Sequence, residues 1–164
     1  RHFFNKTLEK KLAQLKGTSE FLTFFILDID HFKLYNDHFG HQKGDEALIL
    51  VANAIQNYIK SRDEVVFRLG GEEFGGLITN QNPKEMADWI AKLNSEVAKL
   101  KIVHADNAPE TFLTVSIGVY SSHVKDMDSI RCLYRKADEA LYLAKQEGRN
   151  KTVVIPSGIL GQCA

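Results

Sequence analysis

The chain has 164 residues, of which 44% are apolar and 26% are charged, proportions typical of one globular domain with no room for a second. Its 21 Lys and Arg residues balance its 21 Asp and Glu residues, so no global electric field would draw it to nucleic acid or to an acidic membrane. The longest apolar stretch, residues 21–27, is far shorter than the roughly 20 residues needed to span a bilayer.

The first half of the chain alternates helical and extended patterns. Apolar residues at helical spacing before Gly17 predict a helix that ends there. The apolar run of residues 21–29 is typical of a buried strand, and we expect a loop holding Gly40 and Gly44 to follow it. A second helix is predicted from an apolar face formed by Leu48, Ala52, Ile55 and Ile59. We expect its first turn to contain Asp45 and Glu46, because the helix dipole favours negative charges there.

The second half continues the alternation. Strands at residues 65–69 and 74–79 flank two glycines and two glutamates, which predicts a hairpin. Pro83 opens a third helix, a strand follows at 112–120, a fourth helix is closed at Gly148, and residues 152–155 form a last strand. This order predicts an α+β fold, in which helices pack on a mostly antiparallel sheet with a ferredoxin-like βαββαβ core.

Acidic residues lie at two strand ends. Asp28 and Asp30 are two residues apart where the first strand ends, so both point to the same side, and Glu72 and Glu73 occupy the hairpin turn. If the two strands are neighbours, three or four carboxylates converge on one edge, which suits Mg²⁺ or Mn²⁺. The alternative is that acidic pairs at turns are only solvated. Gly70 and Gly71 favour the first interpretation, because two glycines let the backbone approach a ligand closely.

Candidate ligands for phosphates and for a base lie nearby. Lys33 follows the first strand, and Lys145 and Arg149 lie four apart at the end of the last helix, where they could equally well only satisfy the helix dipole. Side chains able to read a base edge follow the first strand: Asn36, His41 and Asp45. The alternative is a turn residue at Asn36 and a helix-terminal charge at Asp45.

Together these segments resemble the GGDEF domain of the diguanylate cyclase family. The similarity is carried by DIDHFKLYNDHFGHQKGD at 28–45, GGEEF at 70–74, VSIGV at 115–119, and ADEALY, AK and GRNK between 137 and 151. The motifs agree in order and spacing over nearly the whole chain, and we therefore treat residues 1–164 as a single such domain. We expect it to be the C-terminal catalytic part of a longer signalling protein.

The resemblance implies the palm-like fold of nucleotidyl cyclases and the condensation of two GTP into cyclic di-GMP with release of two pyrophosphates. Asp28, the main-chain carbonyl of Ile29 and Glu72, with Glu73 beside them, would hold Mg²⁺ or Mn²⁺, two ions per site. Asn36 and Asp45 would recognise guanine, and His41 would lie against the substrate. Gly70 and Gly71 would also bind the substrate, and the phosphates would be contacted by Lys33, Lys145 and Arg149. Glu72 would either take the 3′-hydroxyl proton or only position the metal.

The product joins two GTP molecules, so the resemblance also implies a homodimer whose two sites face each other. An upstream sensor or regulatory domain is expected in the parent protein.

Two cysteines, Cys132 and Cys163, are too few for a disulfide framework and favour a cytoplasmic location, although the parent could be membrane-anchored. Many members of the family carry an Arg-x-x-Asp motif that binds the product and inhibits the enzyme. At the corresponding positions this sequence has Ser61 and Glu64. The alternatives are a catalytically silent GTP-binding module and a pure interaction domain.

Overall fold

The computed structural model describes residues 20–60, 64–124 and 130–156, with positions 10, 13, 14 and 18. The apolar residues of the helix expected before Gly17, together with Ser61 and Cys163, lie outside the described residues. The elements follow in the order β1 (Phe21–Ile29), α2 (Phe32–Phe39), α3 (His41–Ile59), β2 (Val65–Gly70), β3 (Glu73–Asn80), α4 (Pro83–Ala98), β4 (Val115–His123), α5 (Ile130–Gln146) and β5 (Thr152–Ile155).

The strands form a five-stranded sheet in the order β2-β3-β1-β4-β5. β1 pairs antiparallel with β3 and with β4, β2 pairs antiparallel with β3, and only the β4–β5 pair is parallel. The first four strands therefore have the ferredoxin-like arrangement, with β5 added beside β4. This confirms the α+β fold with a mostly antiparallel sheet that the sequence predicts.

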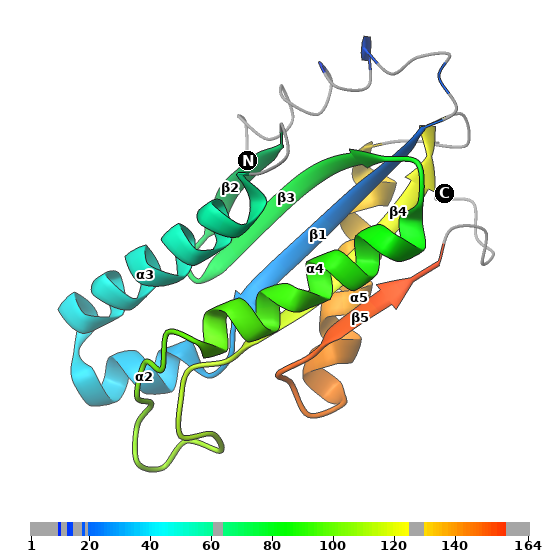
Figure 1. Ribbon diagram of the computed structural model, residues 1–164. Coiled ribbons are helices and arrows are strands. Elements are labelled where there is room, and N and C mark those ends of the chain that lie inside the picture. The colour runs from blue at the N-terminus through cyan, green and yellow to red at the C-terminus, as the bar shows by residue number, and fades with distance from the viewer. Residues whose placement is uncertain are drawn as a thin grey trace.

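Helices cover both faces of the sheet, with α3 and α4 on one side and α5 on the other (Figure 1). Successive side chains of a strand point to opposite faces, and the central strand β1 is apolar on both. Phe25, Leu27 and Ile29 pack into the larger core with α3 and α4. Leu22, Phe24 and Ile26 belong to the smaller core with α5. Among the helices within the described ranges, none has the length and apolar content that a membrane span requires.

The paired glycines of β3, Gly75 and Gly76, are explained by packing. Phe25 lies opposite Gly76 in the register, and a β-carbon on Gly76 would overlap the Phe25 ring. A β-carbon on Gly75 would lie 3.1 Å from atoms of both Phe67 and Leu69. Large aromatic and aliphatic side chains thus fill the space that the two glycines leave in the sheet.

The sequence prediction was wrong for the segment between β1 and the helix that follows it. A loop was expected there, but residues 32–39 form helix α2, and α3 begins already at His41. Gly40, with a φ of 86°, separates the two helices. Asp45 therefore lies in the second turn of α3 and not in its first turn, and Gly44 is helical and buried.

The strand expected at 112–120 is shifted, and β4 is Val115–His123. The preceding residues bond elsewhere: Phe112 forms an isolated bridge with Val103, and the main-chain oxygen of Thr114 accepts from the N–H of Asp30 at 2.9 Å. The segment before β4 is thus tied to the end of β1.

Candidate active site

The end of β1 carries a buried carboxylate, Asp28, whose side chain pairs with a lysine. Asp28 is 7% exposed and lies opposite Glu73 of β3 and Ser116 of β4. Lys145 of α5 approaches it, with Nζ 2.9 Å from Oδ2. Burial raises the pKa of Asp28 to about 6, Lys145 opposes that rise, and the negative charges of Glu72 and Glu73 add to it. The charge on Asp28 is therefore only partly compensated by the protein.

The signature turn is held against this strand end. Gly71 has a φ of 52°, a left-handed conformation that glycine adopts without strain. Arg68 of β2 donates from Nε to the Gly71 main-chain oxygen at 2.8 Å, and the N–H of Ile29 donates to the Glu72 main-chain oxygen at 3.4 Å. Gly70 is exposed, and Glu72 and Glu73 are half-buried. The glycine-led turn thus brings both glutamates beside Asp28 and Ile29.

Of the three or four carboxylates expected to converge at this edge, three lie near one another and the fourth, Asp30, is engaged elsewhere. Asp28, Glu72 and Glu73 are close enough to influence one another electrostatically, but Asp30 is bound by protein donors: Thr114 Oγ1, Ser116 Oγ and the Asn150 N–H. In the described part of the chain, no group of three or more His, Cys, Asp or Glu side chains is placed to hold a metal ion.

The donors near the end of β1 nevertheless fit the chemistry of a hard divalent cation. Carboxylate and carbonyl oxygens are the ligands that Mg²⁺ and Mn²⁺ prefer. A cation beside Asp28 would also offset the unfavourable burial of its charge and the repulsion from Glu72 and Glu73. Asp28, Ile29 and the two glutamates are therefore suitable candidates for holding such an ion.

The three predicted phosphate ligands differ in their surroundings. Lys145 is half-buried and forms the ion pair with Asp28, so its position is not explained by the helix dipole alone. Arg149 is half-buried in the turn after α5, with Nη1 3.4 Å from the Lys145 main-chain oxygen. Lys33 is exposed in the first turn of α2.

The residues expected to read the base lie on α2 and α3. Asn36 Oδ1 is buried without a hydrogen-bond partner, and its amide lies against Gly44, where a β-carbon would collide with it. A buried, unpaired carbonyl oxygen is costly unless a ligand or water satisfies it. His41 and Asp45 are exposed at the beginning of α3.

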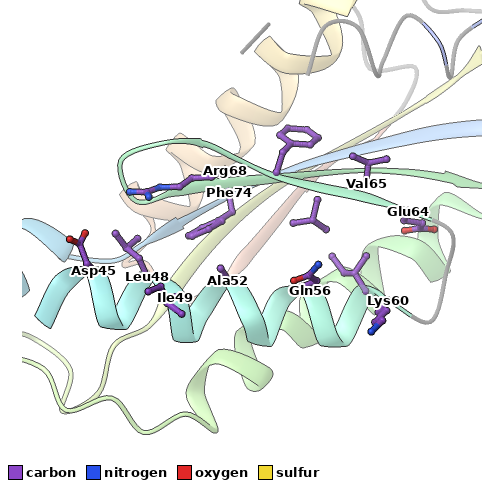
Figure 2. A pocket seen from close by; sticks show the side chains of 13 residues that line it. Asp45, Leu48, Ile49, Ala52, Gln56, Lys60, Glu64, Val65, Arg68 and Phe74 are labelled. Carbon is purple, nitrogen blue, oxygen red and sulfur yellow. The ribbon is translucent and has the colours of Figure 1, made fainter. Parts of the chain in front are cut away.

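A groove of about 850 Å³ runs between α3 and β2, and no pattern in the sequence predicted it. Figure 2 shows Asp45 and Leu48 of α3 at one end, opposite Arg68 and Phe74 of the hairpin, with Lys60 and Glu64 at the other end. Between these ends its walls are mostly apolar, with the polar side chain of Gln56 among them. The groove offers an apolar slot beside the candidate base reader Asp45.

A buried histidine was also not expected from the sequence. His104 is 4% exposed, its Nδ1 accepts from the Ala105 N–H at 2.7 Å, and its ring lies edge-on to Tyr35. Burial lowers the pKa of His104. The segment around it lacks apolar periodicity, so no sequence signal indicated that it would be buried.

Comparisons with known proteins place the chain in a family. Residues 1–151 match the family model described as "Diguanylate cyclase, GGDEF domain". Diguanylate cyclase DosC of Escherichia coli K12 is 35% identical over 153 residues, which make up 92% of this chain and 32% of DosC. The chain therefore belongs to the GGDEF domain family of diguanylate cyclases. It spans between 32% and 42% of the length of the first curated relatives that it matches.

Solved structures agree with this assignment. The GGDEF domain of DgcB from Caulobacter crescentus, determined in complex with c-di-GMP, has a TM-score of 0.81 at 28% identity over 94% of this chain and 89% of that one. The active GGEEF domain of a diguanylate cyclase from Vibrio cholerae has a TM-score of 0.71 at 33% identity over 91% of this chain and 94% of that one. The fold is thus the palm-like α+β fold that the resemblance implies.

Proposed function

We propose that this domain condenses two GTP molecules into cyclic di-GMP and releases two pyrophosphates. The observation that carries the proposal is the junction of the GGEEF turn with the end of β1, where Asp28 is buried with one cation, Lys145, and with two repelling glutamates. Such a carboxylate suits a site that receives a further positive charge with its ligand.

GTP would lie with its base near α2 and α3 and its phosphates near the end of β1. Asp45 would accept from the ring and exocyclic N–H groups of guanine, and the unpaired Asn36 Oδ1 would gain a partner. His41 would lie against the nucleotide. Lys33, Lys145 and Arg149 would bind the triphosphate, while Gly70 and Gly71 would allow it to approach the turn.

The reaction is an in-line attack of a 3′-hydroxyl on an α-phosphorus, with pyrophosphate as the leaving group. Divalent cations, Mg²⁺ or Mn²⁺ and two per site by family analogy, would be held by Asp28, Ile29, Glu72 and Glu73. Bound there, they would lower the pKa of the 3′-hydroxyl and neutralise charge on the entering and leaving oxygens. Glu72 would accept the hydroxyl proton or orient that cation. Lys145 and Arg149 would stabilise the negative charge that builds up on the departing pyrophosphate.

One site binds one GTP, whereas the product joins two, so two domains must face each other with their nucleotides antiparallel. We infer that a homodimer is the active form and that an upstream regulatory domain of the parent protein controls its assembly. The rate per subunit should therefore rise with protein concentration.

The test is incubation of the protein with GTP and Mg²⁺, followed by chromatography of the nucleotides. The wild type should produce cyclic di-GMP and pyrophosphate, Glu72→Gln should lose at least about 100-fold in rate, and the exposed control Glu110→Gln should match the wild type. GTP binding without turnover by the wild type would instead indicate a silent GTP-binding module. Absence of GTP binding would indicate an interaction domain.

A further inference from the structure

Asp30, which directly follows β1, is a buried carboxylate that the proposed reaction does not use. It is 2% exposed. Its Oδ1 accepts from Ser116 Oγ at 2.6 Å, and its Oδ2 accepts from Thr114 Oγ1 at 2.8 Å and from the Asn150 main-chain N–H at 3.1 Å. The last of these bonds crosses 120 positions of sequence to the turn between α5 and β5.

That turn has an unfavourable backbone conformation. Gly148, Arg149 and Asn150 have φ values of 105°, 63° and 49°, and a left-handed conformation is strained for residues that carry a β-carbon. The N–H of Arg149 donates to the Ala144 main-chain oxygen at 2.9 Å, which closes the end of α5. The Asn150 N–H is used by Asp30, so a charged acceptor stabilises the strained residue next to Arg149.

The turn carries one of the proposed phosphate ligands and lies next to another. Lys145 is in the last turn of α5 and Arg149 is in the α5–β5 turn, joined by the Arg149 Nη1 contact to the Lys145 main-chain oxygen. Asp28, which pairs with Lys145, is two residues from Asp30 on the same strand end. Asp30 therefore fixes the α5–β5 turn to the segment that carries Asp28 and Ile29.

We propose that Asp30 is a positioning residue for the triphosphate site: through the Asn150 N–H it holds residues 148–150 in their left-handed conformation and so places Arg149, with Lys145, beside the end of β1. This inference rests on the proposed function, because it assigns those two cations to the phosphates of GTP. It assigns no contact between Asp30 and the metal or the nucleotide.

The experiment compares Asp30→Ala with Asp30→Asn, Asn150→Gly, the double variant Asp30→Ala/Asn150→Gly and the exposed control Asp106→Ala. Two quantities are measured on each folded protein: the affinity for α,β-methylene-GTP with Mg²⁺ by calorimetry, and the hydrogen exchange of the amides at 148–151. Asp30→Asn keeps one acceptor oxygen and provides a second variant if Asp30→Ala does not fold.

We expect Asp30→Ala to weaken analogue binding about 10-fold and to speed exchange of the Asn150 amide, with Asp30→Asn between it and the wild type. Asn150→Gly should restore part of the affinity that Asp30→Ala loses, because glycine adopts a φ of 49° without strain. A structural defect elsewhere would not be rescued in this way.

Two results would overturn the inference: faster exchange at Asn150 with unchanged affinity, or weaker affinity with unchanged exchange and no rescue by Asn150→Gly. Failure of nucleotide binding looks different, because the wild type itself would then bind no analogue, whereas a silent GTP-binding module would bind the analogue but form no cyclic di-GMP from GTP. If no analogue binds, the assignment of Arg149 and Lys145 to phosphates falls, while the exchange measurement still shows whether Asp30 holds the turn.

Discussion

Asp28 and Asp30 stand two residues apart at the same end of β1, both nearly inaccessible to solvent, yet their surroundings differ. Asp30 accepts hydrogen bonds from two hydroxyls and one main-chain N–H. Asp28 has one lysine partner and two acidic neighbours, and burial raises its pKa to about 6. A buried carboxylate whose oxygens are satisfied by the protein serves the structure, whereas one left under-compensated is available to a ligand.

The largest effect that separates the two residues is on activity. Asp28→Asn should reduce cyclic di-GMP formation about 10³-fold, because the amide cannot supply the negative oxygen that a divalent cation needs. The rate is measured by chromatography at saturating GTP and Mg²⁺, with the exposed Asp106→Asn as the matched control. Activity within a few-fold of the wild type would contradict the assignment of Asp28.

The second effect is on stability in the absence of divalent cations. The pKa of Asp28 is raised from 3.8 to about 6 in the folded protein, so the unfolded chain loses this proton first as pH rises. The stability that the protonated form of Asp28 permits is thus fully present below about pH 4. The free energy of unfolding then falls as the pH rises through about 6. Asp28→Asn should therefore be more stable than the wild type by about 3 kcal/mol at pH 7 and nearly equal to it at pH 3.5.

Urea unfolding of the two proteins in EDTA across this pH range measures the difference. Lys145, which loses its partner in the variant, is 31% exposed and can be solvated, so it should not mask the gain. A variant that is less stable than the wild type at pH 7 would show that the Asp28–Lys145 pair is net stabilising.

A smaller effect is expected around Asp30. Ser116→Ala removes one hydroxyl donor from its carboxylate and should lower the free energy of unfolding by about 1.5 kcal/mol. The matched control is Ser122→Ala, also on β4 and buried, whose hydroxyl donates to a neutral main-chain oxygen at 3.3 Å. Urea unfolding should show a smaller loss for the control, and equal losses would mean that Asp30 does not depend on this donor.

Much of this arrangement could be predicted from the sequence, and the exceptions have physical causes. The apolar run of β1 and the glycines between two short strands define the sheet centre and the hairpin, because they are local patterns. Helix α2 was missed because it is short and mostly polar on its surface, with only Phe32 and Tyr35 buried. The acidic residues at the strand end and in the hairpin turn pointed to Asp28 and Glu72 as neighbours, and the two are close enough to interact electrostatically.

The different surroundings of Asp28 and Asp30 could not be predicted in the same way. On a strand both point to one side, and nothing local distinguishes them. The donors that satisfy Asp30 come from Thr114, Ser116 and Asn150, which are 84 to 120 positions away in sequence. Such contacts depend on the tertiary fold.

The most direct test of this account is an anomalous difference map from crystals grown with α,β-methylene-GTP and Mn²⁺. We predict that manganese is bound by Asp28, the main-chain carbonyl of Ile29 and Glu72, and that Asp30 stays bonded to Thr114, Ser116 and Asn150. Manganese bound by Asp30, or a nucleotide-loaded site in which Asp28 takes no part, would contradict it.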